Sequence, residues 1–156
     1  MLPGGAYWVV PGRLLAGPHP ARMLEAFRQA GITSFVDLTE RDEGLPTYAD
    51  DFAPERHVRM PIRDFACPSV DEMTAILARI DAELARGETV YVHCYGGRGR
   101  TGTVVGCWLV RHGASGDAAL ARVSELRRGF AGASPETDAQ RRFVAAWRAE
   151  PTASAP

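Results

Sequence analysis

The residues best suited to chemistry stand between positions 93 and 102, where the sequence reads HCYGGRGRTG. Cys94 is a potential nucleophile, and Arg100 places a permanent cation six positions after it. A glycine-rich turn can aim several backbone N–H groups at one point, and a helix that begins there adds partial positive charge. A cysteine and an arginine facing such an anion-binding loop predict chemistry on a phosphate group.

Four side chains of this stretch have expected roles. The loop amides, the helix N-terminus and a nearby guanidinium favour the thiolate form of Cys94, so we expect a nucleophile at neutral pH. Arg100 opens the helix and is expected to hold two phosphate oxygens in bidentate fashion. We expect Thr101 to direct its hydroxyl at the sulfur of Cys94, and His93 to order the loop through hydrogen bonds of its ring.

The remaining loop residues are candidates for binding the substrate. The glycines let the chain wrap tightly and keep side chains out of the anion site. Arg98 comes too early to clamp the phosphate, so it either attracts an acidic substrate at the rim or is simply solvated. Tyr95 either forms a wall of the pocket or packs under the loop. The substrate-binding set is therefore Tyr95, Gly96, Gly97, Arg98, Gly99 and Arg100.

Two elements must position this loop. Residues 89–92 form a β-branched and aromatic run typical of a buried strand, and residues 103–110 are almost continuously apolar, as in a buried helix. Further strands are expected at 7–10, 13–16, 32–38 and 56–60, and further helices at 20–30, 70–84 and 117–128. Strands separated by helices predict an α/β domain with a central, mostly parallel sheet flanked by helices, and with 89–92 at its centre.

Local signals set several of these boundaries. Ser69 and Glu72 fit a capping box, followed by an apolar stripe from Val70 to Leu84. Ser134-Pro135 predicts the start of the last helix, with proline in its first turn, and Phe143, Val144 and Trp147 as its core face. Residues 39–54 are acidic and interrupted by glycine and proline, which predicts a long exposed loop.

Composition limits the kind of protein. The 156 residues are 46% hydrophobic and 24% charged, and 18 basic residues nearly balance 19 acidic ones. This favours one domain of ordinary size over 1–150 with a flexible tail at 151–156, and it argues against a broad nucleic-acid or membrane surface. Every basic residue is arginine, which favours a GC-rich, bacterial genome. Three cysteines without a CxxC pair, and an N-terminus unlike a signal peptide, favour the cytoplasm.

The motif resembles a known signature. HCYGGRGRTG fits the HCxxGxxR(S/T)G pattern of the cysteine-dependent protein tyrosine phosphatase superfamily, and it is most similar to the small dual-specificity branch. The HCYGG part resembles kinase-associated phosphatase. Two weaker segments of similarity are Pro61-Ile62-Arg63-Asp64 and residues 134–140, with the sequence SPETDAQ. The resemblance implies a dual-specificity-phosphatase-like fold and hydrolysis of phosphomonoesters through a phosphocysteine, with no metal or other cofactor.

The resemblance also implies partners for the nucleophile. The leaving group needs a proton, and Asp64, in a loop 30 positions before Cys94, matches the aspartate that supplies it. Gln140 matches the glutamine that places the hydrolytic water, and Glu136 either orients Arg100 or that water, or only complements the helix dipole. Asp37, Asp42, Asp50 and Asp51 are weaker candidates for the acid because of their positions.

The expected substrate is phosphotyrosine in proteins, with phosphoserine and phosphothreonine as further targets. Alternatives from the same chemistry are inositol phosphates, phosphoinositides and RNA 5′ ends, and an alternative of another class is a phosphate-binding pseudophosphatase. A rhodanese-like sulfur transferase fits the long loop with its late Thr101-Gly102 less well. Cys67 either forms a protective disulfide with Cys94 under oxidation or has no chemical role, and Cys107 is expected to pack within a helix.

Overall fold

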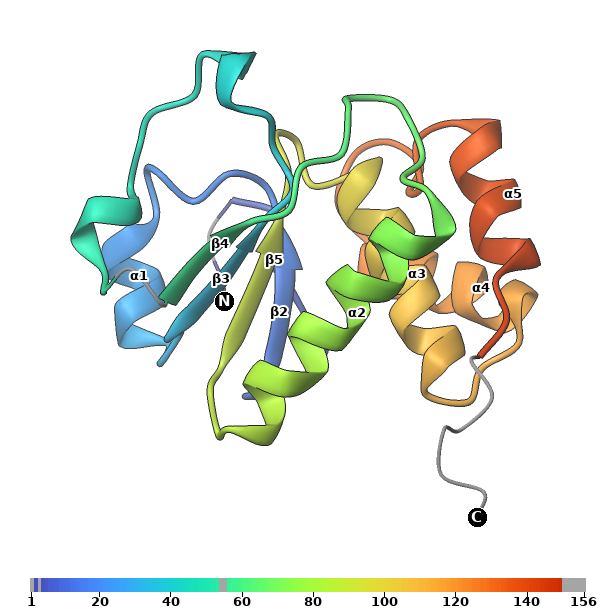
Figure 1. Cartoon of the computed structure of the whole chain (residues 1–156), viewed down its shortest axis with the longest axis horizontal. Coiled ribbons are helices and arrows are strands. Elements are labelled where there is room, and N and C mark those ends of the chain that lie inside the picture. Colours follow the sequence, from blue (N-terminus) through green and yellow to red (C-terminus); the bar gives the residue numbers. More distant parts are fainter. Residues whose placement is uncertain (1, 3, 54–55, 150–156) are drawn as a thin grey trace.

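A five-stranded sheet forms the centre of the computed structural model, which describes residues 2, 4–53 and 56–149 (Figure 1). Its strands, in spatial order, are β1 (Tyr7–Val10), β2 (Leu14–Gly17), β5 (Val90–His93), β3 (Ser34–Asp37) and β4 (His57–Arg59). β1 and β2 are antiparallel, and the other three neighbouring pairs are parallel. The predicted α/β class, the mostly parallel sheet and the central place of the strand before Cys94 are confirmed.

Helices cover both faces of the sheet unequally. Figure 1 shows α1 (Leu24–Gln29) on one face, and α2 (Val70–Ala85), α3 (Arg100–Arg111), α4 (Gly116–Leu126) and α5 (Asp138–Ala146) on the other. Side chains alternate along β5, because successive residues of a strand point to opposite faces. Val90 and Val92 therefore join the larger core, and Tyr91 joins the smaller core beside Phe27 of α1.

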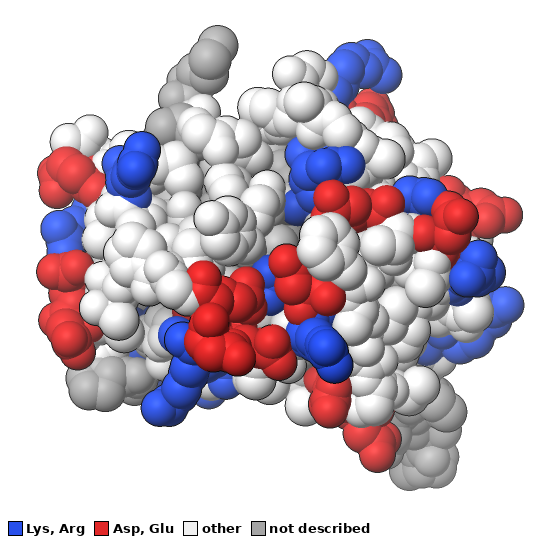
Figure 2. Space-filling model, turned by 90° about the horizontal axis from the view of Figure 1, so that it is seen from above, with Lys and Arg blue, Asp and Glu red and all other residues white. Residues whose placement is uncertain are grey.

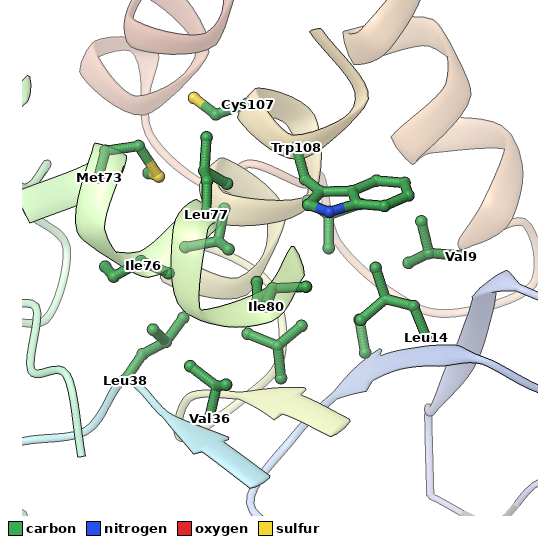
Figure 3. Close-up of a cluster of buried hydrophobic side chains, with 14 of the residues drawn as sticks. Val9, Leu14, Val36, Leu38, Met73, Ile76, Leu77, Ile80, Cys107 and Trp108 are labelled. Atoms are coloured by element: carbon green, nitrogen blue, oxygen red, sulfur yellow. The ribbon is translucent and has the colours of Figure 1, made fainter. Parts of the chain in front are cut away.

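The predicted capping box at the start of α2 is present, with Ser69 Oγ accepting from the Glu72 amide at 3.0 Å. The apolar stripe of this helix packs in the larger core, and Figure 3 shows Ile76 and Ile80 of α2 lying toward Leu38 and Val36. Val70 was expected to belong to this stripe but is 62% exposed, because it is the first residue of the helix. Its side chain therefore contributes little to the core.

The loop prediction for residues 39–54 was partly wrong. The segment contains two short 3₁₀ turns, η1 (Arg41–Glu43) and η2 (Ala49–Asp51), and the side chain of Tyr48 between them is buried. Its ring packs edge-on against Phe35 at a centroid distance of 5.2 Å, and its hydroxyl contacts Nε2 of His93. Burial of this one aromatic ring fixes the loop on the sheet; Pro54 lies outside the described residues.

The last helix begins later than predicted. Thr137 caps α5, because its Oγ1 accepts from the Gln140 amide at 3.1 Å and the Gln140 side chain completes a capping box. Ser134 belongs instead to the preceding loop, which packs so closely on the start of α3 that a Cβ added at Gly102 would collide with Ser134 Oγ. Val144 and Trp147 are buried as expected, and Phe143 is partly buried.

Two other expectations concern features outside this architecture. The predicted flexible tail, 151–156, lies outside the described residues. Among the helices that the structure describes, none combines the length and apolar character needed to cross a membrane.

Candidate active site

The loop between β5 and α3 encloses the sulfur of Cys94, which is 2% exposed. The amide of Gly97 donates to Cys94 Sγ at 3.2 Å, and such a donor stabilises a thiolate. Gly97 has a φ of 75°, and a Cβ there would lie 2.6 Å from the backbone of Gly17 and Pro18. Only glycine therefore lets the loop close down on β2 and bring this amide to the sulfur.

Arg100 is the first residue of α3 and is 1% exposed. Its Nη1 donates to the carbonyl oxygens of Leu38 at 3.4 Å and Ile62 at 3.0 Å. Its two terminal nitrogens also bind both carboxylate oxygens of Glu43, at 2.7 and 2.9 Å. Among the described residues, the buried Nε of Arg100 has no hydrogen-bond partner. The guanidinium is thus fixed on one side and keeps a donor for an anion.

Glu43 is a functional residue that sequence reasoning missed. Its side chain is 13% exposed, and the fork-to-fork pair with Arg100 sets the plane of the guanidinium. Burial alone would raise the pKa of Glu43, but hydrogen bonds from Arg100 and the Glu40 amide lower it overall. Burial likewise disfavours the charged form of Arg100, yet Glu43 keeps the Arg100 pKa above its usual value. Nothing in the sequence of residues 39–54 distinguished Glu43 from Asp42 and the other acidic residues as a partner for Arg100.

The structure brings Asp64 to the site, as predicted. Its carboxylate lies 3.3 Å from Nη2 of Arg100, and its side chain is 48% exposed. Asp64 Oδ1 also accepts from the amide of Phe65 at 3.0 Å. Phe65 has a φ of 64°, which a non-glycine residue seldom adopts, so the chain turns sharply just after the acid. A carboxylate on a solvent-exposed turn beside the anion site can reach a leaving group.

These residues form an anion-binding loop with a nucleophile, a fixed cation and a nearby carboxylate. A family model described as "Swiss Army Knife protein, DSP-PTPase phosphatase domain" matches residues 3–155. The chain belongs to this dual-specificity phosphatase family. The family resemblance that the HCYGGRGRTG motif predicted is therefore confirmed, and the sheet with its flanking helices is a dual-specificity phosphatase fold.

Several phosphatases are similar to this family member. The crystal structure of Tk-PTP in its active form shares 32% identity and superposes with a TM-score of 0.76, covering 92% of this chain and 95% of that one. Dual specificity protein phosphatase CDC14AB of Danio rerio is 34% identical over 70% of this chain but 20% of its own length. Phosphatidylglycerophosphate phosphatase PTPMT2 of Arabidopsis thaliana is 34% identical over 64% of this chain and 45% of its own. The chain thus spans between a fifth and half of these curated relatives.

The Thr101 side chain points in a direction that differs from the prediction, and the Tyr95 side chain decides between the two positions considered for it. Thr101 Oγ1 donates to the carbonyl of Gly17 at 3.3 Å, so the first turn of α3 aims this hydroxyl at β2 and not at the sulfur of Cys94. The Tyr95 side chain is 56% exposed, and its carbonyl accepts from the His19 amide at 3.1 Å. Tyr95 therefore stands at the rim of the phosphatase site and does not pack under the loop.

The second loop arginine is tied down. Arg98 Nε donates to the carbonyl of Ala133 at 3.2 Å, and its Nη1 lies 3.0 Å from Glu136 Oε1. Glu136 thus pairs with Arg98 and not with Arg100. Arg98 is neither freely solvated nor available as an uncompensated charge, which weakens its expected role in attracting acidic substrates. Its backbone remains part of the anion-binding loop.

Gln140 is brought to the phosphatase site, but in a different manner from the one expected. Its side chain is fully buried, with Oε1 accepting from the amides of Glu136 and Thr137 and Nε2 donating to the carbonyl of Ala66. An amide bonded to the protein at both ends is poorly suited to place a water. The water-placing role of Gln140 stays a prediction, and these contacts favour a different one.

The three cysteines are free. Burial raises the pKa of the Cys67 thiol, with Arg142 opposing the effect, and burial raises that of Cys107 further. Cys107 is packed in α3 as expected. A disulfide between Cys67 and Cys94 under oxidation stays a prediction. Among the described residues, no group of three or more metal-ligating side chains that could hold a metal ion is present.

His93 orders the phosphatase loop, as predicted. Its ring is fully buried, with Nδ1 3.2 Å from the carbonyl of Cys94 and Nε2 against the hydroxyl of Tyr48. Burial lowers the pKa of His93 to about 4 and outweighs the opposing charge of Asp37. A neutral ring fits both contacts, because Nδ1–H then donates to Cys94 and Nε2 accepts from Tyr48.

This buried imidazole predicts a loss of stability in acid. An unfolded chain binds a proton at His93 near pH 6.5, whereas the folded chain does so only near pH 4, so acidification through this window favours unfolding. We expect His93 to contribute about 2 to 3 kcal/mol to the fall in unfolding free energy between pH 7.5 and 4.5. Urea denaturation of wild type and His93→Asn at both pH values measures how much His93 contributes to the pH dependence of the unfolding free energy.

The matched control for this prediction is His112→Asn. The His112 side chain is 44% exposed and contacts Asp81 just after the end of α3, so this variant shows what the loss of a surface histidine does to the pH dependence of unfolding. If His93→Asn keeps the full acid sensitivity of wild type, the buried imidazole is not its source.

Proposed function

We propose that this protein hydrolyses phosphomonoesters through a phosphocysteine intermediate, with phosphotyrosine in proteins as its main substrate and phosphoserine and phosphothreonine as further ones. One observation carries the proposal: the Gly97 amide bonds the sulfur of Cys94 while Glu43 holds Arg100 with a buried Nε unpaired. This arrangement places a stabilised nucleophile and an oriented cation in one anion site.

The first chemical step forms the intermediate. The Cys94 thiolate attacks phosphorus, a phosphorus–sulfur bond forms, and the bond to the leaving oxygen breaks with its electron pair on that oxygen. Asp64 in its protonated form donates its proton there, so the alcohol or phenol leaves neutral. Arg100 and the loop amides donate to the three non-bridging oxygens of the phosphoryl group. They thereby stabilise the negative charge that these oxygens carry in the transition state.

The second step regenerates the enzyme. A water attacks phosphorus, the phosphorus–sulfur bond breaks, and Cys94 leaves as a thiolate that the Gly97 amide stabilises. Asp64, now ionised, takes the proton of the attacking water and is ready for the next cycle. Inorganic phosphate is the second product, and neither step requires an oxidant, a reductant or a metal.

The rim supports an aryl phosphate as substrate. Phe65 beside the acid and Tyr95 beside the nucleophile are both largely exposed, and such aromatic side chains can pack against the ring of phosphotyrosine. Figure 2 shows acidic and arginine side chains intermixed on the face that carries the loops, without a continuous basic surface. This mixture is compatible with a protein substrate and disfavours a polyanion such as RNA.

Lipid or inositol phosphates are the second candidate. One of the relatives is named as a phosphatidylglycerophosphate phosphatase. A cavity of about 610 Å³ adjoins the catalytic loop, residues 94–99, through His19, whose amide donates to the carbonyl of Tyr95. Arg41 and Arg59 also line this cavity. A headgroup larger than phosphotyrosine would find room there, although Asp37 and Glu40 also line the cavity and Asp37 pairs with Arg59, and this class is the main competitor.

A substrate panel tests the proposal. We expect para-nitrophenyl phosphate and a phosphotyrosine peptide to be hydrolysed, with kcat/KM on the peptide at least about 10-fold above that on phosphatidylglycerophosphate, inositol phosphates or 5′-phosphorylated RNA. Phosphoserine and phosphothreonine peptides should be slower. The opposite order would support the lipid or inositol class, and a wild type that binds phosphopeptide but hydrolyses no phosphoester would support a pseudophosphatase.

We further propose that the protein works in the cytoplasm of a bacterium. Its three free cysteines suit a reducing compartment, and the use of arginine alone as basic residue suits a GC-rich genome. Fractionation of the native host with antibody detection tests the location. Recovery in a membrane or extracellular fraction would contradict it.

A further inference from the structure

Gln140 lies where three segments of the site meet: the start of α5, the catalytic loop and the loop that carries Asp64. We propose that Gln140 is a positioning residue that locks the Asp64 loop onto the catalytic loop. Its loss therefore impairs protonation of the leaving group by Asp64 more than hydrolysis of the phosphocysteine, in which a thiolate leaves and the base contributes less. The inference rests on the proposed phosphatase activity and assigns Gln140 to the placement of Asp64, whereas its sequence motif implied the placement of water.

The contacts of the Gln140 amide join two of these segments. Oε1 accepts from the amides of Glu136 and Thr137, both at 3.1 Å, which fixes the side chain at the N-terminus of α5. Nε2 donates to the carbonyl of Ala66 at 3.3 Å, across 74 positions of the chain. Since the side chain is fully buried, this link is shielded from competing water.

The same part of α5 is fixed to the catalytic loop. A Cβ added at Gly99 would lie 3.0 Å from both polar atoms of the Gln140 amide, so the amide packs directly on the backbone before Arg100. Ser134 Oγ donates to the carbonyl of Arg98 at 2.6 Å, and Glu136 pairs with the Arg98 side chain. Gln140 therefore transmits the position of the catalytic loop to Ala66.

Asp64 stands midway between two such anchors. On its N-terminal side the carbonyl of Ile62 accepts from Arg100 at 3.0 Å, and on its C-terminal side the carbonyl of Ala66 accepts from Gln140. Between them the chain passes through Phe65 at a positive φ, and the Asp64 side chain is half exposed. Removing the second anchor releases the C-terminal side of this turn, and a displacement of the acid by about 1 Å can cost 10²-fold in rate.

The test compares Gln140→Glu and Gln140→Met with wild type on two substrates. Glutamate keeps an acceptor for the two amides but offers Ala66 no amide donor, and methionine removes all three bonds without adding a charge. Para-nitrophenyl phosphate has a good leaving group that needs little protonation, whereas phenyl phosphate depends on the acid. We expect kcat on phenyl phosphate to fall by about 10- to 100-fold and kcat on para-nitrophenyl phosphate by less than about 3-fold, the pattern of Asp64→Asn.

Thr137→Ala is the matched control. It removes the acceptor for the Gln140 backbone amide, and so weakens the same helix cap, but leaves the bond from the Gln140 side chain to Ala66. We expect this variant to keep the wild-type ratio of the two rates. Thermal unfolding of all variants shows whether each is folded at the assay temperature, and Gln140→Met decides the test if the buried charge of Gln140→Glu prevents folding.

A different outcome would overturn the inference. If Gln140 places the hydrolytic water, both substrates lose rate equally and phosphocysteine accumulates, as seen by a burst of phenol release and by intact mass. Hydrogen exchange of residues 63–67 adds a readout that needs no turnover: it should accelerate in both Gln140 variants and not in Thr137→Ala. An inert wild type would contradict the proposed function, whereas unchanged exchange would contradict the lock itself.

Discussion

Cys94→Ser is expected to lower hydrolysis of para-nitrophenyl phosphate by on the order of 10⁴-fold or more. A serine hydroxyl stays protonated at neutral pH, and the amide of Gly97, which donates to the sulfur in the wild type, cannot make it an anion. The substitution is nearly isosteric, and the loop conformation depends on glycines and on His93. Steady-state kinetics and intact mass after rapid quench measure the loss of turnover and of the phosphocysteine.

Binding should survive this substitution. Arg100 and its partner Glu43 are unchanged, so the variant should still bind a phosphotyrosine peptide, which calorimetry can measure. Cys107→Ala is the matched control, because Cys107 is a thiol buried in the core side of α3. It should retain turnover. Wild-type rates in Cys94→Ser would mean that the nucleophile is a different group.

Arg100→Lys is expected to reduce kcat/KM by about 10³-fold, even though the charge is kept. A lysine ammonium is a point charge on a flexible chain. It cannot bind both oxygens of Glu43 and the carbonyl of Ile62 and still offer a fixed donor to phosphate, as the guanidinium does. Kinetics on para-nitrophenyl phosphate, with inhibition by vanadate as a measure of transition-state binding, should show parallel losses.

Glu43→Gln separates orientation from charge. The amide retains one acceptor for Arg100 and loses the second oxygen of the bidentate pair, so we expect a smaller loss of about 10-fold in kcat/KM. Arg122→Lys on the exposed side of α4 should behave as wild type, because Arg122 pairs only with Glu125 among the described contacts. If Arg100→Lys retained wild-type activity, a planar clamp would not be part of the mechanism.

The sequence alone predicted those parts of the fold and the site whose determining residues lie close together in the chain. The strand 90–93, the glycine loop and the buried helix are contiguous in the chain, so the nucleophile, the cation and the anion site could be predicted together. The capping box at Ser69 is equally local and was found. At the last helix two local signals competed, and the cap at Thr137 with Gln140 prevailed over Pro135 because the preceding loop packs on Gly102.

The determinants that sequence did not reveal join distant parts of the chain. Glu43 meets Arg100 across 57 positions, and Tyr48 meets His93 across 45, from a loop whose composition suggested only solvent exposure. The bond from Gln140 to Ala66 spans 74 positions, and the motif around Gln140 did not imply this contact. Such contacts depend on how the strand ends are arranged, which periodicity and spacing do not encode.

Burial of β5 on both faces has a consequence for how this protein can change. The nucleophile follows a strand whose residues pack alternately into two cores, Val92 into one and Tyr91 into the other. Both faces of β5 are packed against other residues, so the strand has no room to shift. The sulfur of Cys94, which follows the strand, is therefore held as rigidly as the core. Mutations that repack either core would therefore be detected as altered turnover, while new substrates are more readily acquired through the rim residues Phe65 and Tyr95.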